Sequence, residues 1–557
     1  MVRCSPVRPW EIGLLVVALY ALGWVGLNRV NADWMNHLEV PLDWTSRGVS
    51  IWQQLRAGKG LAPSEYPNGQ YLVSAAFYSV FGFSRSVAIC SQSIFLVPYI
   101  VGCWWIGREL GGRGGGCLTL LAAAGNPWMA FHLSEMVPEV GVSGLVALAL
   151  ALLLASKAGR VPGPSLALGV VLGLGMLTKW SFGFFMAMPV LWPVWLAWRE
   201  EGSSRKLAVI SLACLPLTLG VLKAAIPEAR TAFPWIPYLF SMSVWLLLAV
   251  AAWQCWRTEG WNAGVATALA WSIGFTVCSW CYFMSISLMQ AKAFDDLTHN
   301  PILNPSQICL YGPLSTCCAG PMTMVWLGLG VLVGLSSRDL RGFTLSALGG
   351  ILLPLGFYIY TRVPSSTFYM LPATVFVLAL SFGWWGRVRF APVALAPMLL
   401  FLGVVGLGSW TLATPGRQPP ILWDEVIVRA WFGPRLVFVP PPDLGTTPAR
   451  ATAVRALTEL GHLGEERLMV VLPDGWHPLP NALFLEAATL GRLLQVQEIY
   501  ADLWQEPLPE IYSSLVVVIE GSESMTWPEQ WQSRFEFLER WDGDKHGCWS
   551  LHRRFRE

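Results

Sequence analysis

Charged residues are scarce in this chain, and neither sign is in large excess. Only 13% of its 557 residues are Asp, Glu, Lys or Arg, and the formal net charge is +2. Proteins that bind nucleic acid carry strongly basic surfaces, so no nucleic-acid partner is expected. Glycine-rich phosphate loops and cysteine pairs at zinc-finger spacing are missing as well. Neither a nucleotide cofactor nor a zinc finger is therefore expected.

Apolar residues dominate instead. Hydrophobic residues make up 54% of the chain, and the mean hydropathy is +0.50, which excludes a soluble globular protein. Stretches long enough to cross a bilayer as a helix recur as far as residue 411. The sequence predicts a polytopic α-helical membrane protein with about 13 transmembrane helices, near residues 10–28, 86–107, 117–133, 140–156, 163–178, 181–198, 206–225, 238–256, 264–288, 321–337, 343–361, 367–386 and 391–411.

The short loops between these spans divide Lys and Arg unevenly. Basic residues fall in alternate loops, from Arg3 and Arg8 near the N-terminus to Arg387 and Arg389. Because cytoplasmic loops collect positive charge, the N-terminus is expected in the cytoplasm and the long loop 29–85 outside. No small-residue cleavage pattern follows the first span, so we expect it to be retained.

The composition changes after residue 411. A linker at 412–420 is followed by residues 421–557, which are ordinary in composition and contain short buried strands alternating with helices. Strands are expected at 467–472 and 514–519, and helices at 449–460 and 480–493. This region is predicted to be a soluble extracytoplasmic α/β domain, and residues 1–411 a multi-helix transmembrane domain.

The first external loop carries more polar residues than a membrane anchor needs. Asp33, Asp43 and Glu65 place three carboxylates at one membrane surface, where an acid, a base or a metal ligand could act on a lipid-borne substrate. Within this loop, Trp44–Leu55 and Tyr71–Phe83 are predicted to be helices lying in the membrane interface, because their polarity is mixed.

Three further ionisable residues are expected on the same face. Glu139 lies just before a span, Lys179 at a tight external turn between two spans, and Arg362 just outside another span. Ionisable groups at the membrane edge are costly and are functional candidates by default. Acids with two fixed cations could bind a metal ion, a phosphate and a sugar together. The competing interpretation is that these loops are polar because they meet water and lipid headgroups.

Most cysteines lie in or near apolar spans, where they are expected to be small buried hydrophobes. Cys309, Cys317 and Cys318 differ, because they share one predicted external loop. An oxidising compartment would permit a disulfide between Cys309 and either Cys317 or Cys318.

Four segments form a recognisable set: the acidic first loop, Glu65-Tyr-Pro-Asn-Gly-Gln-Tyr71, Asn126 to Glu139, and Gly173-Leu-Gly-Met-Leu-Thr-Lys-Trp-Ser181. Together they resemble segments of the GT-C membrane glycosyltransferases, in particular the bacterial branch of protein O-mannosyltransferases and the lipid A aminoarabinose transferase. The acidic first loop is similar to the loop that carries the family's catalytic Asp. The sequence departs from the family at Asn68, where a second Pro is usual, and at Glu139, where Asp is commoner.

The resemblance implies transfer of a sugar from a polyprenyl-phosphate donor to a glycan, lipid or protein acceptor outside the cytoplasm, in a bacterial inner membrane. Asp33 is the first choice as the base that activates the acceptor hydroxyl, and Asp43 is its rival. Lys179 and Arg362 would bind the donor phosphate. Attack opposite the phosphate would invert the anomeric centre.

The resemblance leaves two roles for the other acids. Glu65 and Glu139 would either position the acceptor or bind a divalent metal ion that shares the phosphate charge.

Two other classes of function remain open. A transporter or flippase would also place charged groups among many helices, but internal repeats and interrupted helices typical of transporters are not evident. A non-catalytic relative could bind lipid or assemble envelope machinery.

Overall fold

The structure is a computed structural model. It describes residues 6–28, 39–59, 66–126, 129, 132–133, 137–200, 202–224, 236–298, 321–361, 367–387, 454–460, 467–472, 485, 488, 495–500, 515–520, 535–541 and 548–554. The chain divides into two compact units. The first comprises Met1–Arg29, Ala62–Gln70 and Gln92–Phe438, and the second Val30–Leu61, Tyr71–Ser91 and Val439–Glu557.

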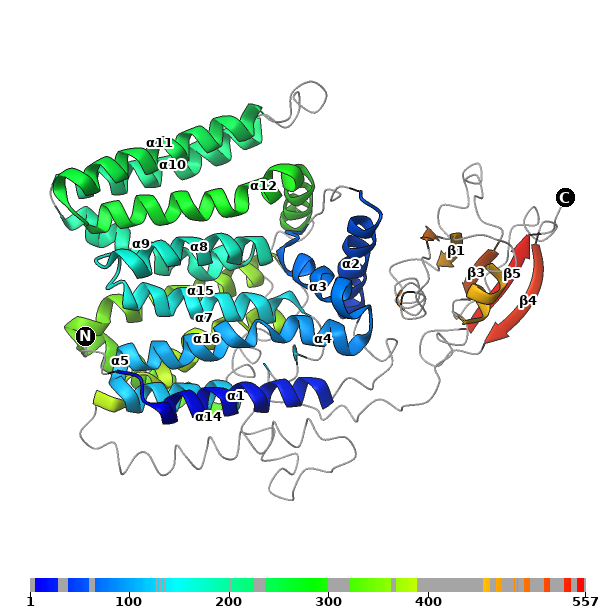
Figure 1. The fold of residues 1–557 in the computed structure, drawn as a ribbon, viewed down its shortest axis with the longest axis horizontal. Helices are drawn as coiled ribbons and strands as arrows, with labels where there is room; N and C mark the ends of the chain where they lie inside the picture. Colours follow the sequence, from blue (N-terminus) through cyan, green and yellow to red (C-terminus); the bar gives the residue numbers. More distant parts are fainter. Residues whose placement is uncertain are drawn as a thin grey trace, which may run out of the picture. The chain divides into compact units, whose positions relative to one another are not determined.

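The first unit is helical (Figure 1). Its helices are α1 (Pro9–Asn28), α5 (Leu96–Ala124), α7 (Pro138–Ala155), α8 (Pro162–Thr178), α9 (Phe182–Arg199), α10 (Ser203–Ala224), α11 (Ile236–Glu259), α12 (Ala263–Thr298), α14 (Pro321–Ser336), α15 (Arg338–Thr361) and α16 (Ala373–Phe382), with the short 3-10 helices η2 (Thr367–Met370) and η3 (Trp385–Arg387).

Length and composition mark part of this unit as membrane-spanning. Among the described residues, five helical stretches are long and apolar enough to cross a bilayer, namely Ser86–Ala124, Pro138–Ala155, Tyr238–Glu259, Ala263–Cys281 and Arg338–Tyr358. The prediction of a mostly helical integral membrane protein is confirmed. The count of 13 spans stays a prediction, and the span expected at 391–411 lies outside the described residues.

Several predicted spans differ from the structure, and two of the differences have a clear physical cause. α5 contains a break at Gly111 and Gly112, where Gly112 has φ of +70°, so two helical halves are joined there as the sequence predicted. The second half ends at Ala124, however, and the helix expected to continue to residue 133 stops early. Gly125 caps the helix and Pro127 follows, a combination that ends helices.

The other difference concerns residues 367–386, which were predicted as one span. The structure has η2, α16 and η3 instead, and Pro372 is the N-cap residue of α16. Because proline has no amide hydrogen to donate and clashes with the preceding turn, it ends η2 and begins a new helix.

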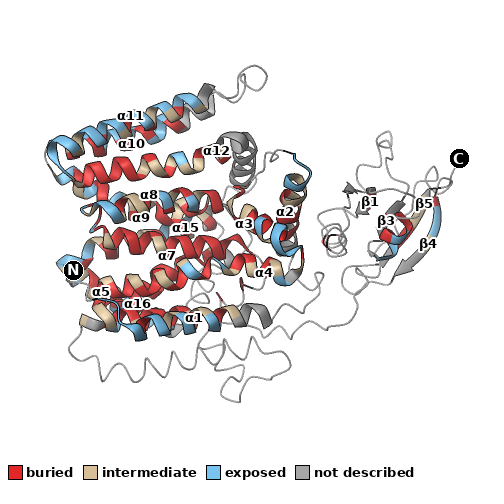
Figure 2. Cartoon of the chain, in the orientation of Figure 1, coloured by how far each residue is buried: buried red, intermediate tan, exposed pale blue. Residues whose placement is uncertain are grey.

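α7 lies at the centre of the helical unit, and 89% of its residues are buried (Figure 2). Small residues allow its close approach to α5. A methyl group added to Gly102 of α5 would lie 2.5 Å from the carbonyl carbon of Ala147, and one added to Gly144 would lie 2.4 Å from the carbonyl oxygen of Phe95. These contacts fix the start of α7, which carries Glu139.

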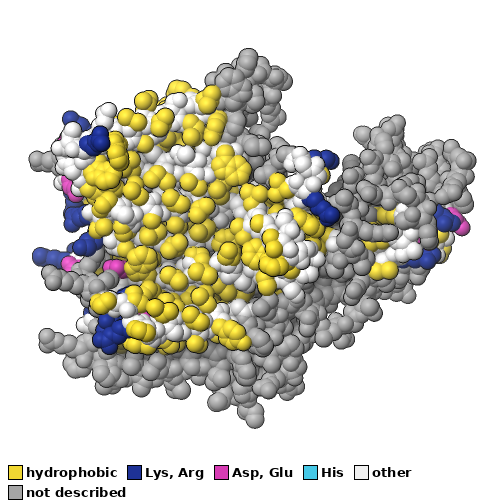
Figure 3. All heavy atoms as spheres, viewed as in Figure 1, with side chains coloured by type: hydrophobic (Ala, Val, Ile, Leu, Met, Phe, Trp, Pro, Cys, Tyr) yellow, Lys and Arg dark blue, Asp and Glu magenta, His cyan; other side chains and the backbone are white. Residues whose placement is uncertain are grey.

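On the face shown in Figure 3, the exposed Lys and Arg side chains of the described helical unit gather at one end of the helices. There the buried Glu11 carboxylate lies 3.8 Å from Arg108 Nε and 4.0 Å from Arg113 Nε, and Arg387 donates from Nε to the Leu110 carbonyl oxygen. These arginines come from loops that the sequence assigned to one side of the membrane. The membrane side itself stays a prediction.

The second unit contains α2 (Glu39–Arg56), most of α3 (Gly69–Phe81) and most of α4 (Arg85–Ser93). The Trp52 and Tyr78 rings meet edge to face with centroids 6.1 Å apart, and the hydroxyls of Ser74 and Ser91 are 2.9 Å apart. The helices predicted at Trp44–Leu55 and Tyr71–Phe83 are confirmed. Their location in the membrane interface remains a prediction.

The second unit also contains a five-stranded mixed sheet in the order β2-β1-β3-β5-β4. β1 pairs in parallel with β2 and β3, and β5 pairs antiparallel with β3 and β4. The strands are β1 (Arg467–Leu472), β2 (Gln495–Tyr500), β3 (Leu515–Glu520), β4 (Phe535–Trp541) and β5 (Cys548–Arg554).

The two strands predicted from sequence are β1 and β3, with a shift of one residue in β3. The sequence did not predict β2, β4 or β5. A helix at 454–460 agrees with the one expected there. The domain boundaries at 411 and 421 and the extracytoplasmic location stay predictions.

Candidate functional site

The candidate site is built around Lys179, the residue that follows α8. Its backbone is extended, and its N–H donates to the Gly175 carbonyl oxygen to close the helix. The next helix begins three residues later, so Lys179 lies in a tight turn, as the sequence predicted. Only 3% of the residue is exposed. An ammonium group this deeply buried requires a partner of opposite charge.

Glu139 is that partner. It lies in the first turn of α7, after Pro138, and is 1% exposed. The Lys179 ammonium group donates to Glu139 Oε1. The other oxygen, Oε2, is buried and has no hydrogen-bond partner among the described residues. The carboxylate also benefits from the positive end of the α7 dipole.

Two tyrosine rings flank the Lys179 ammonium group. Nζ lies 5.0 Å from the centroid of the Tyr369 ring and 6.0 Å from that of Tyr66. Both distances lie within the range of cation–π attraction. Tyr66 precedes α3 and Tyr369 lies in η2, so three distant parts of the sequence meet at this lysine.

The segment Tyr66 to Gln70 packs onto the same end of the helices. A methyl group on Gly69 would lie 2.6 Å from the Leu177 carbonyl oxygen in the last turn of α8. The Asn68 N–H donates to Cys281 Sγ of α12, at 3.5 Å. A methyl group on Gly141 of α7 would lie 2.8 Å from Gln70 Oε1. Because Gly69 and Gly141 have no side chain, this segment can pack closely against α7 and α8, beside Lys179.

Two buried polar residues make long-range hydrogen bonds in this unit, and one of them bonds the start of α7. Gln92 Nε2 donates to the Val137 carbonyl oxygen at 2.8 Å, and Val137 is the N-cap residue of α7. Asn126 Nδ2 lies 3.3 Å from the Tyr99 hydroxyl and 3.4 Å from Thr374 Oγ1. Asn126 belongs to a segment already recognised as a motif.

The sequence did not indicate Tyr369 or Gln92 as parts of the site, and Gln70 entered only as a member of the motif at 65–71. Gln92 stands between Ser91 and Ser93 in the span predicted at 86–107, and its sequence neighbours give no sign of a role in the site.

The structure brings together two of the predicted site residues, Glu139 and Lys179. Asp43 lies in α2, and its side chain lies outside the described part of the chain. The remaining residues predicted for the site or the disulfide also lie outside it, namely Asp33, Glu65, Arg362, Cys309, Cys317 and Cys318. Their roles stay predictions.

The described residues do not by themselves fit a divalent metal ion. Within them, no group of three His, Cys, Asp or Glu side chains could hold a metal. Glu139 already faces an ammonium group, whose positive charge opposes a cation at the same carboxylate. The proposed partner ligand, Glu65, lies outside the described part.

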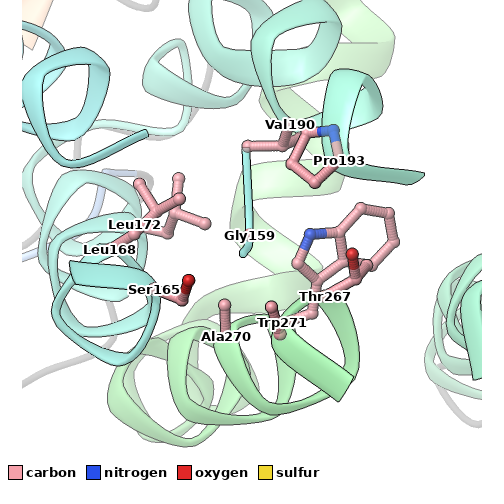
Figure 4. A pocket seen from close by; sticks show the side chains of 10 residues that line it. Gly159, Ser165, Leu168, Leu172, Val190, Pro193, Thr267, Ala270 and Trp271 are labelled. Carbon is pink, nitrogen blue, oxygen red and sulfur yellow. The ribbon is translucent and has the colours of Figure 1, made fainter. Parts of the chain in front are cut away.

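A separate apolar pocket lies between α8, α9 and α12 (Figure 4). Its lining includes Ser165 and Leu168 of α8, Pro193 of α9 and Trp271 of α12. Leu172, the lining residue of α8 nearest to Lys179 in sequence, lies seven residues before it, which is about 10 Å along a helix. Glu139, Lys179 and Tyr369 do not line this pocket, so it is not part of the candidate site.

One segment of the chain matches a known protein family. Residues 66–228 match the family described as dolichyl-phosphate-mannose-protein mannosyltransferase. The likeness to GT-C membrane glycosyltransferases is confirmed. The matched segment covers less than half of the chain, but it includes both Glu139 and Lys179. No protein of curated function matches the sequence.

Solved structures give weaker similarities. AglB, an oligosaccharyltransferase of Archaeoglobus fulgidus solved with an inhibitory peptide and a dolichol-phosphate, is 14% identical with a TM-score of 0.47, over 88% of this chain and 64% of AglB. ArnT of Cupriavidus metallidurans bound to undecaprenyl phosphate is 13% identical with a TM-score of 0.39, over 98% of each chain. This chain spans 64% of the length of AglB, so the activity of AglB does not carry over to it.

Proposed function

We propose that this chain is an integral membrane glycosyltransferase that transfers a sugar from a polyprenyl-phosphate donor to an acceptor hydroxyl outside the cytoplasm. The observation that carries the proposal is the buried ion pair of Lys179 and Glu139, within the segment that matches the mannosyltransferase family. A buried pair at the ends of two apolar helices is costly. The presence of this ion pair is explained if the site binds an anionic lipid headgroup at the membrane surface.

Lys179 and Arg362 would hold the donor phosphate. The phosphate gains charge as the sugar leaves, and fixed cations stabilise this charge in the transition state. The acceptor oxygen attacks the anomeric carbon as the bond from that carbon to the phosphate oxygen breaks. The electron pair of that bond leaves with the lipid phosphate, and the anomeric configuration is inverted.

The first external loop would supply the base. Asp33, or Asp43 in its place, takes the proton of the acceptor hydroxyl as the new glycosidic bond forms. Glu139 would position the acceptor, because its free Oε2 can accept a hydrogen bond from a hydroxyl group, and Glu65 would assist it. The proposed steps do not involve a metal ion. The C-terminal domain would lie outside the cytoplasm and help to bind the acceptor.

Transfer should be measured in proteoliposomes with a panel of labelled polyprenyl-phosphate sugars and with Asp33→Asn, Asp43→Asn and Lys179→Met. We expect one Asp variant and the Lys179 variant to lose transfer by about 100-fold or more. Lys206→Met is a matched control, because Lys206 is exposed, and it should retain the wild-type rate.

Three outcomes would count against the proposal in different ways. Wild-type rates for both Asp variants would remove the first loop from the mechanism. Donor binding without any transfer by the wild-type protein would instead indicate a non-catalytic lipid-binding relative. Movement of intact lipid-linked sugar across the bilayer would indicate a flippase.

A further inference from the structure

Gln92 is a buried polar residue near the end of α4. Its side chain makes a long-range hydrogen bond to the N-cap residue of α7. Its side-chain amide donates to the Val137 carbonyl oxygen at 2.8 Å, across 45 residues of sequence, and Gln92 itself is buried. No charged group takes part in this bond. A glutamine in such a position costs conformational entropy and desolvation, so its hydrogen bond is expected to serve a purpose.

The accepting carbonyl lies at the beginning of α7. Val137 is the N-cap residue and makes no side-chain capping hydrogen bond. Its carbonyl oxygen accepts the N–H of Val140 at 3.2 Å as well as the Gln92 amide. Because valine cannot cap a helix with its side chain, the start of α7 depends on Gln92 for an anchor outside the helix.

The anchor lies two residues from Glu139. Pro138 stands between them, and its ring fixes φ near −65°. The chain from Val137 to Glu139 therefore has little freedom, and a shift at the N-cap carries through to the Glu139 carboxylate. Gly141 and Gly144, packed against Gln70 and Phe95, restrain the following turns.

We infer that Gln92 is a positioning residue, which acts through Val137 to hold Glu139 in its pair with Lys179. The inference rests on the proposed function, because it assigns Gln92 a part in the same site. Gln92 would not touch the donor or the acceptor. Its effect on transfer would come only through the position of the carboxylate.

Gln92→Met tests this role, because methionine keeps the length of the side chain and removes the donor. We expect the transfer rate in proteoliposomes to fall by about 10- to 100-fold, the scale of a displacement of about 1 Å at a reacting centre. Gln92→His, which restores an N–H donor, should recover part of the rate. Gln54→Met is the matched control, since the Gln54 amide donates to Ser50 of the same helix, α2, at 3.3 Å.

A double-mutant cycle separates positioning from general stability. If Gln92 acts through Glu139, adding Gln92→Met to a Glu139→Gln protein should lower transfer by no more than about 2-fold, because the group it positions is already lost. Independent, multiplying losses would overturn the inference. A merely structural role would multiply in this way.

Hydrogen exchange gives a readout that does not require activity. In Gln92→Met, the amides of Val137 and of residues 139–143 should exchange at least about 10-fold faster than in the wild type, while α12 is unchanged. Unchanged exchange at α7, or a wild-type transfer rate in Gln92→Met, would overturn the inference. Failure of the wild-type protein itself to bind or transfer any donor would instead refute the proposed function, and the role of Gln92 would fall with it.

Discussion

Lys179 and Glu139 are 40 residues apart in the sequence, and their side chains form a buried ion pair between the end of α8 and the start of α7. Both residues lie in the segment that matches the mannosyltransferase family, and their ion pair joins two helix ends within it. A cation and an anion so placed depend on each other, because either one alone would be an uncompensated charge away from water.

Removal of one partner should therefore cost more than removal of both. We expect Lys179→Met or Glu139→Gln alone to lower the free energy of unfolding by about 3–5 kcal/mol. The double variant should be more stable than either single variant. Denaturant unfolding of the purified protein in detergent measures the three values. A loss in the double variant equal to the sum of the two single losses would show that the two side chains do not interact.

The Tyr369 ring should contribute to the stability of the same lysine. Its centroid lies 5.0 Å from Lys179 Nζ. Tyr369→Leu removes the ring's attraction for the cation and should lower stability by about 1–2 kcal/mol, whereas Tyr369→Phe keeps the ring and should change it little. Thermal unfolding of the two variants compares them directly. If Phe and Leu destabilise equally, the ring–cation contact is not important.

The close packing of α5 on α7 should not tolerate an added methyl group. A Cβ at Gly102 would lie 2.5 Å from the Ala147 carbonyl carbon, which is backbone and cannot turn aside. We expect Gly102→Ala to destabilise the protein by about 1–3 kcal/mol and to lower transfer through a shift of α7.

Gly13→Ala is the control for that substitution, because nothing lies within 4 Å of a Cβ at Gly13 in α1. It should be neutral or stabilising by up to about 1 kcal/mol, since alanine favours helix more than glycine does. Thermal unfolding measures both variants. Similar melting temperatures for Gly102→Ala and Gly13→Ala would contradict the packing argument.

The C-terminal sheet should lose stability in mild acid. Burial lowers the pKa of His552 in β5 from 6.5 to about 4; the ring lies against Phe537 and 2.9 Å from Ser550 Oγ. Between these pH values the unfolded state binds more protons than the folded state, so stability falls as pH drops through this window.

The size of this loss is at most about 2 kcal/mol, because the ring is only partly buried and solvent screens it. Hydrogen exchange of β5, measured at pH 7 and pH 5 and corrected for the intrinsic rate, should show weaker protection at pH 5. His552→Gln should remove that difference. A variant with the same pH dependence as the wild type would assign the effect to another group.

Elements that form from one continuous apolar stretch were predicted well from the sequence. Uniformly apolar stretches gave helices close to their predicted bounds at α8 and α14, and the buried runs gave β1 and β3. The half-polar strands β2, β4 and β5 carried no such signal, because edge and partly exposed strands mix polar and apolar residues without a continuous apolar run. Hydropathy alone predicted helices that continue through Gly125 and Pro372, but the structure has a helix boundary at each of these residues.

The candidate site was predicted as a set of residues on one face, and not as a set of contacts. Lys179 and Glu139 were both named from the sequence, and Tyr369 and Gln92 were not. Tyr369 is one of 13 tyrosines, and its importance depends on η2 bringing it to the lysine. Nothing in its immediate sequence distinguishes it from a residue at the membrane interface.

Composition and loop charge were enough to establish a polytopic membrane protein with acids and a lysine expected on a common face, because both depend only on local length, apolarity and charge. The pairing of Glu139 with Lys179 depended on the fold. After its first turn α7 carries apolar residues, glycine and Ser143, so hydropathy does not indicate which side faces α5 or α8. Only the tertiary structure shows which neighbours its glycines contact, and these contacts turn Glu139 toward Lys179.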